Sequence, residues 1–399
     1  MENSPTPISI SATRKTASNT FLPLNTKRVS DDDLYRTSTQ YKLWSFTSKR
    51  LEQIRSDINL RSSEIIKKQI IQFKESHPNL STEELEAIDS LAIPLNADEE
   101  FKLVNFYARK VQQCASSLNL PTEVTATAIS FFRKFFLTNS VMDIHPKNIL
   151  LTTIFLACKS ENYFIGIESF AQKTKSKEDA ILKYEFKVLE SLKFTLLNHH
   201  PFKALHGFFL DIQSILNGKV DLEYMGQVYT NSKKKITDAL LTDAVYQYTP
   251  PQITLAVLLA EDQTLIDRYL ELKFPNKNKD NSVDVIKPTS ADSTNTTSGS
   301  SSNGNMEVKE VVQSKEVPNE GNETTNDNTN MIDLPKLIKT IQDCRDIIFE
   351  RQSVTKEEVK EIDAKLHYCK NPMLVLRRLK RQKDSSSSAS PPDIKRQKL

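Results

Sequence analysis

Apolar residues recur through most of the chain at the spacing of one helix face. Between about 97 and 117, Val104, Ala108, Val111 and Ala115 follow a 3.6-residue period, which predicts an amphipathic helix. Proline and capping signals delimit further segments. These predicted helices cover about 48–76, 81–92, from 121 onward, 147–160, 167–174, 177–193, 201–216, 221–246, 250–260 and 332–350, and a further pair of helices covers about 355–380.

The segment after Pro146, "KNILLTTIFLACKS", is apolar on nearly every face, which predicts a buried central helix. "PPQITLAVLLA" from Pro250 repeats this pattern at an offset of about 104 residues. The second segment repeats the apolar helix but not the charged residue at its end, Lys159. The helical bundle itself therefore does not require Lys159. In the segment 177–193, we expect Ile181, Leu182, Phe186, Leu189 and Leu192 to point inward.

Polar, low-complexity segments separate the helical ones. Residues 1–29 are rich in Ser, Thr and Pro, and residues 276–330 contain almost no large apolar side chains, so both are predicted to be disordered. A basic tail at 382–399 is predicted to be disordered as well. The aromatic residues within 31–46 predict a strand-like arm that docks on a neighbouring surface.

Composition favours an all-α protein. The 399 residues include only seven glycines, about a quarter of average usage, whereas β-rich and phosphate-cradling folds need glycine at their turns. A formal charge of +3 is too small for nucleic-acid binding by the whole molecule. Four widely spaced cysteines without a CxxC motif indicate buried thiols of a reduced, intracellular protein.

Motifs for catalysis, cofactors and membrane insertion are missing from the sequence. It contains no GxxxxGK[ST], GxGxxG, GxSxG or HExxH, and no signal peptide or run of about 18 apolar residues. The His199-His200 pair lies before a proline and is more typical of a structural or solvated pair than of a metal site. We therefore expect no enzyme activity, cofactor, metal site or membrane association.

Two successive five-helix units, the ending "LACKSEN" and the segment "KYEFKVLESLKF" resemble the cyclin box. The arm "TSTQYKLWSF" with "FFRKFFLTNSVMDIHP", "LNHHPFKALHGFFLDI" and "ALLTDAVYQYTPPQITLAVLLA" is more specifically similar to the cyclin H subfamily. The asparagine- and serine-rich linker is typical of a fungal member. The fold class implied is all-α, with two tandem cyclin boxes and extra terminal helices. The expected boundaries are 30–94 for the N-terminal arm and helices, 95–198 and 199–275 for the boxes, and 331–381 for the C-terminal helices.

The resemblance implies a nuclear, non-catalytic subunit that binds and activates a cyclin-dependent kinase. The resemblance also implies that this cyclin and its kinase are part of the kinase module of transcription factor IIH. This module phosphorylates the RNA polymerase II C-terminal domain. The implied partners are the kinase catalytic subunit, a RING-finger assembly factor and the factor IIH core, with no direct nucleic-acid contact. The substrate-docking motif of cell-cycle cyclins is absent from "FKLVNFYARK", so no such docking is predicted.

The resemblance also implies site residues. In cyclins, a lysine that ends the third helix and a glutamate in the fifth meet the kinase near its mobile αC helix. Lys159 and Glu185 match these positions, and Glu161 and Asn162 are neighbouring candidates. The alternative is that Lys159 only complements its helix dipole and Glu185 is solvated. Tyr41 and Trp44 either contact the partner or pin the arm to the first bundle.

The sequence is also compatible with one alternative function and one targeting signal. A DNA-binding factor related to factor IIB shares the repeated cyclin fold, but it carries an N-terminal zinc ribbon, and this chain has no cysteine before Cys114. The basic residues near the C-terminus form either a bipartite nuclear import signal or a solvated tail. The candidate import residues are Arg377, Arg378, Lys380, Arg381, Lys395 and Arg396.

Overall fold

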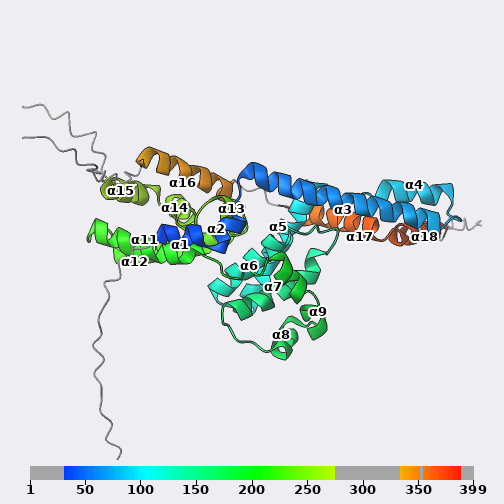
Figure 1. Cartoon of the computed structure of the whole chain (residues 1–399), viewed down its shortest axis with the longest axis horizontal. Helices are drawn as coiled ribbons and strands as arrows, with labels where there is room; N and C mark the ends of the chain where they lie inside the picture. The colour runs from blue at the N-terminus through cyan, green and yellow to red at the C-terminus, as the bar shows by residue number, and fades with distance from the viewer. Residues whose placement is uncertain (1–30, 275–332, 351–353, 388–399) are drawn as a thin grey trace, which may run out of the picture. The chain divides into compact units, whose positions relative to one another are not determined.

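A computed structural model describes residues 31–274, 333–350 and 354–387 (Figure 1). These ranges contain eighteen helices and no strand, which confirms the predicted all-α class. None of these helices has the length and apolar character needed to cross a bilayer. The segments 1–29 and 276–330 and residues 388–399 of the tail lie outside the described residues. Residues 382–387 of the tail are the end of a helix (α18, Met373–Ser387), so the predicted disorder was wrong for them.

The chain divides into two compact units. Of the described residues, unit 1 comprises 31–107, 130–199 and 362–387, and unit 2 comprises 108–129, 200–274, 333–350 and 354–361. Unit 1 holds α1 (Asp31–Thr37), α2 (Thr39–Trp44), α3 (Ser48–Ser76), α4 (Thr82–Leu91), α7 (Pro146–Ser160), α8 (Ile167–Thr174), α9 (Glu178–Leu182), α10 (Glu185–Ser191) and α18 (Met373–Ser387). Unit 2 holds α11 (Pro201–Leu216), α12 (Leu222–Ala239), α13 (Ala244–Gln247), α14 (Pro250–Glu261), α15 (Gln263–Lys273) and α16 (Leu334–Phe349). Helices α5 (Ala97–Ser117), α6 (Thr122–Phe135) and α17 (Lys356–Lys370) contribute residues to both.

Helix α7 is the buried rod of unit 1, as its apolar pattern predicts. Pro146 occupies a first-turn position, and nine of the fifteen residues of the helix are buried. The Thr152 hydroxyl donates a hydrogen bond to the Ile181 carbonyl oxygen at 2.6 Å, so the rod also fixes α9. Packing on all sides makes α7 a rigid base for whatever its exposed end presents.

Helix α14 has the same role in unit 2. Pro250 begins it, as Pro146 begins α7, and eight of its residues are buried. It contacts α11, α12, α15 and α16. Helix α16 packs on α14 although the two are far apart in sequence, and its buried residues Ile341, Cys344 and Ile348 form the stripe expected of an inward face. The core of unit 2 therefore includes a helix from beyond residue 330.

Three predicted elements differ from the structure. The arm is not extended, because α1 and α2 form there and the Ser38 hydroxyl caps α2 by accepting from the Tyr41 N–H at 3.2 Å. The single helix predicted at 177–193 is broken between α9 and α10, and that at 221–246 is broken between α12 and α13. The hydrophobic pattern continues through these breaks, so periodicity alone did not locate them.

The last described helix packs back on an N-terminal helix within unit 1. Helix α18 packs against α4, and Figure 1 shows both at the same end of α3. Lys383 and Glu83 form an exposed ion pair at 2.6 Å between them. An exposed pair contributes little stability, so apolar packing by residues such as Val375 and Leu376 holds α18 in place.

Candidate functional site

The end of α7 and the start of α10 form a charged pair. Lys159 Nζ lies 2.5 Å from Glu185 Oε1, and the side chains are 48% and 23% exposed. Lys159 Nζ also lies 4.6 Å from the centroid of the Phe155 ring, which is itself buried. The two predicted kinase-contact residues are thus fixed against each other on adjacent helices and remain accessible.

Local sequence explains why α7 ends here. Asn162 adopts the left-handed conformation at φ 55°, which asparagine tolerates better than most residues. The Tyr163 N–H donates to the Cys158 carbonyl at 2.9 Å, and the Asn162 N–H donates to the Lys159 carbonyl at 3.4 Å. These two hydrogen bonds form a Schellman motif at the C-terminus of α7. Asn162 therefore terminates the helix in addition to its predicted partner contact, and Lys159 falls in the last turn.

Large apolar side chains lie exposed in the elements around the pair. The loop after α7 carries Phe164 at 94% exposure, and Phe186, next to Glu185, is 70% exposed. The Phe186 and Phe194 rings are 6.3 Å apart. Leu182, Phe194 and Leu197 are also exposed. Exposed aromatic side chains beside a fixed charge pair are typical of a protein-binding surface.

The expectation that Leu182 and Phe186 point inward was therefore wrong. Ile181 and Leu192 are buried as expected, Leu189 is half-buried, and Val188, which the expectation left out, is also buried. The break at Lys183 and Tyr184 shifts the phase of the inward face, so a single helical wheel over 177–193 misplaced these two residues. The exposure of Phe186 was missed for this reason, whereas Phe164 and Phe194 lie outside the segment 177–193.

The phenylalanine cluster of α6 and the residue after it is core, as its helical spacing predicts. Phe131, Phe132 and Phe135 are fully buried, and Phe136 is 7% exposed. These rings are therefore enclosed by the protein's own side chains.

The arm docks on unit 1 through polar and aromatic contacts. Trp44 is 2% exposed, and its Nε1–H donates to Thr195 Oγ1 at 2.9 Å. Gln40 makes two hydrogen bonds to the His199 backbone, accepting from its N–H at 2.7 Å and donating to its carbonyl at 3.3 Å. Trp44 thus pins the arm to unit 1, whereas Tyr41, at 40% exposure, stays available as a contact residue.

A buried lysine lies under the arm. Lys134 Nζ donates to Asn198 Oδ1 at 2.6 Å and lies 5.3 Å from the centroid of the Trp44 ring. Burial lowers the pKa of Lys134 from 10.5 to about 7. The side chain therefore loses its charge far more readily in the folded protein than in the unfolded chain.

This difference predicts a pH dependence of stability. Between pH 7 and 8.5 the unfolded chain holds the Lys134 proton more tightly, so the free energy of unfolding rises with pH, by at most about 1.4 kcal/mol per pH unit. The window ends below 9.0, the ordinary pKa of the cysteine thiols. Urea unfolding across this range should show the slope in the unaltered protein and not in Lys134→Met. Lys187→Met, which removes an exposed lysine, should keep it, and an equal slope in Lys134→Met would contradict the assignment.

The candidate import residues of the described chain lie on α18. Arg377, Arg378, Lys380 and Arg381 are all exposed. Arg378 also donates to the Tyr368 hydroxyl at 3.3 Å. Lys395 and Arg396 lie outside the described residues. The four described residues of the predicted signal are thus accessible to solvent.

Two family models match the chain in tandem. The cyclin N-terminal domain model matches residues 99–197, and the cyclin C-terminal domain model matches residues 200–349. The second match extends across the linker and includes α16.

Relatives and solved structures agree with these matches. Cyclin CCL1 of Saccharomyces cerevisiae is 51% identical over 94% of this chain and 91% of its own length. Cyclin mcs2 of Schizosaccharomyces pombe is 35% identical over 60% of this chain and 73% of its own length. A chain of the cryoEM structure of the yeast TFIIK complex (Kin28/Ccl1/Tfb3) is 48% identical, with 79% of this chain and all of that chain covered and a TM-score of 0.54. A chain of the CAK complex from Chaetomium thermophilum bound to ATP-gamma-S shares the fold, at 24% identity, 92% and 99% coverage and a TM-score of 0.63.

Proposed function

The chain belongs to the cyclin family, and from this membership we propose that it binds and activates a cyclin-dependent kinase within the transcription factor IIH kinase module. The observation that carries the proposal is 51% identity to Cyclin CCL1 over 94% of the chain. The 48% identical chain in a complex of Kin28, Ccl1 and Tfb3 supports the same assembly. These matches favour the cyclin interpretation over the alternative of a factor IIB-like DNA-binding protein.

In the proposed mechanism, the chain activates the kinase by holding the kinase αC helix in position. A protein kinase works only when its αC helix holds a glutamate against the catalytic lysine. Lys159 and Glu185 offer a donor and an acceptor on rigid helices, and Phe164 and Phe186 offer apolar area beside them. We assign these residues to the αC contact, with Glu161, Asn162 and Tyr41 as flanking candidates. In this proposal the catalytic step belongs to the kinase, and the chain acts by holding αC in position.

A wider assignment extends this proposal, and the TFIIK complex that contains the 48% identical chain supports it. We propose that the kinase module also contains a RING-finger assembly factor, joins the factor IIH core and phosphorylates the RNA polymerase II C-terminal domain. We assign its site of action to the nucleus, where that polymerase works.

Co-purification with a kinase assay tests the function. The full chain should capture a kinase subunit from its source cells. That subunit should phosphorylate polymerase C-terminal-domain repeats much faster with the chain than without it. The chain alone should show no phosphoryl transfer. If the captured kinase gains no activity, or if the chain alone turns over ATP, the proposal is wrong.

Nuclear import gives a separate prediction. Replacing Arg377, Arg378, Lys380 and Arg381 with glutamine removes four exposed positive charges, so we expect a clear shift from nuclear to cytoplasmic signal for a fluorescent fusion. The buried Val375 and Leu376 are kept, so α18 should still pack. Glutamine at the exposed Lys67 and Lys68 is the control. Unchanged nuclear accumulation of the α18 variant would assign these residues to a solvated helix face.

A further inference from the structure

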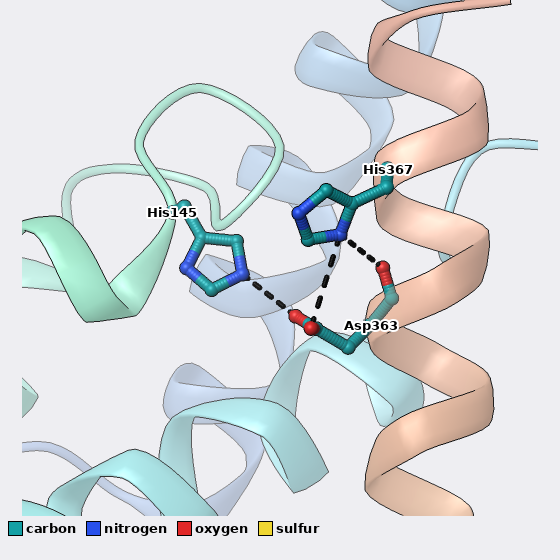
Figure 2. Close-up of side chains that lie close together, drawn as sticks. All are labelled: His145, Asp363 and His367. Atoms are coloured by element: carbon teal, nitrogen blue, oxygen red, sulfur yellow. Dashed lines mark hydrogen bonds and ion pairs between the residues drawn. The ribbon is translucent and has the colours of Figure 1, made fainter. Parts of the chain in front are cut away.

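Three side chains of the kinds that ligate metals meet in unit 1. His145, Asp363 and His367 each present a ligand atom, and these atoms lie within 4.8 Å of one another. Figure 2 shows the two imidazole rings converging on the Asp363 carboxylate from different elements. His145 precedes α7, and Asp363 and His367 lie one turn apart on α17. A separation of 218 residues between His145 and Asp363 explains why no sequence motif predicted a metal site.

The hydrogen bonds orient His367 as a ligand. Its Nδ1 lies 2.7 Å from the Asp363 carbonyl oxygen, which can only accept, so Nδ1 carries the proton. Nε2 is then the nitrogen with the free lone pair. An imidazole held by a backbone carbonyl through its other nitrogen is the arrangement that metal-ligating histidines use. Exposures of 15%, 31% and 54% for the side chains of His145, Asp363 and His367 leave the group reachable from solvent.

His145 must give up two hydrogen bonds to bind an ion. Its Nδ1 accepts from the Lys147 N–H at 3.1 Å, so the Nε2–H donates to Asp363 Oδ1 at 2.7 Å. An ion at Nε2 replaces that proton, which moves to Nδ1, so the bond to Asp363 and the capping bond from Lys147 are both lost. Two hydrogen bonds, at about 1 kcal/mol each, are small beside the free energy of zinc ligation in proteins. The exchange is therefore favourable when the other two ligands are in place.

We propose that His145, Asp363 and His367 form a binding site for a zinc-class divalent ion, with water completing a tetrahedral set. Two imidazoles and one carboxylate suit Zn²⁺ and Co²⁺, whereas Mg²⁺ and Ca²⁺ prefer oxygen ligands. The ion would join the start of α7 to α17 and so tie α17 to the core of unit 1. This site is separate from the Lys159–Glu185 pair and does not depend on the proposed kinase function.

Metal titration of the full chain tests the site. Chelator-stripped protein is titrated with Zn²⁺ by calorimetry and with Co²⁺ by visible absorption, and Mg²⁺ serves as the hard-cation control. We expect one Zn²⁺ per chain, the intense d–d bands of tetrahedral Co²⁺, a raised melting temperature and no response to Mg²⁺. His367→Gln and Asp363→Asn should each weaken Zn²⁺ binding by at least about tenfold.

Matched variants decide the outcome. His367 is exposed, so His367→Gln should fold normally, and its melting temperature without metal reports that directly. His206→Gln, an exposed histidine of α11, should bind Zn²⁺ as the unaltered chain does. If Zn²⁺ does not bind, or if either His367→Gln or Asp363→Asn keeps full affinity, the site is overturned and the cluster is only a hydrogen-bonded histidine–aspartate group.

Discussion

Alanine at Lys159 or Glu185 should weaken kinase association by about 2–5 kcal/mol, or roughly 30-fold to several thousand-fold, while leaving the fold intact. In the free chain the pair is half exposed, and such pairs contribute only about 0–1 kcal/mol to stability. In a complex the partner would desolvate it, so removing one member would leave the other charge buried without its partner. Calorimetric titration of the kinase subunit into each variant measures the loss, and circular dichroism melting checks the fold.

Unit 2 supplies a matched control for this experiment. Lys235 and Glu261 pair at 2.5 Å at the end of α14, the helix that corresponds to α7, with exposures of 36% and 15%. Lys235→Ala removes a similar ion pair of similar geometry, and we expect it to bind the kinase within about twofold of the unaltered chain, a difference of about 0.4 kcal/mol. If Lys159→Ala and Glu185→Ala bind as well as Lys235→Ala does, the assignment of the kinase site is wrong.

Trp44→Ala should be the most destabilising single substitution of the arm. Removing a fully buried aromatic side chain typically costs about 3–5 kcal/mol, since the lost burial adds to the cavity left behind. The Thr195 hydroxyl also loses its donor, and the cations of Lys134 and Lys193 lose the ring that lies 5.3 Å from each. Urea unfolding followed by far-ultraviolet circular dichroism measures the effect on unit 1.

Trp44→Phe separates the effect of burial from that of the hydrogen bond, and Tyr41→Ala is the control on the same helix. Trp44→Phe keeps an aromatic ring but removes the indole donor, so we expect a loss of about 1–3 kcal/mol. Tyr41→Ala, on the same helix at 40% exposure, should change stability by less than about 1 kcal/mol. Trp44 is the only tryptophan of the chain, so its fluorescence in the unaltered protein reports arm docking directly. A loss in Trp44→Ala no greater than in Tyr41→Ala would mean that the arm does not stabilise unit 1.

The sequence by itself determined the fold class, the family and several helix boundaries. Helices α3, α8 and α11 match their predicted ranges, because apolar spacing, caps and prolines act within a turn or two of the chain. The sequence also predicted that α7 and α14 are buried, since a segment that is apolar on all sides has no solvated face. The end of α7 after Lys159 depends on Asn162, which is again a local property.

Only the tertiary structure decided which distant residues meet. It paired Lys159 with Glu185, brought His145 to Asp363 and placed α16 on α14. It also exposed Phe186, because the break after α9 changed which side of the segment faces the core. Such contacts depend on how helices pack side chain against side chain. Periodicity gives the face that a helix buries, but it carries no information about the helix or the residue on the other side.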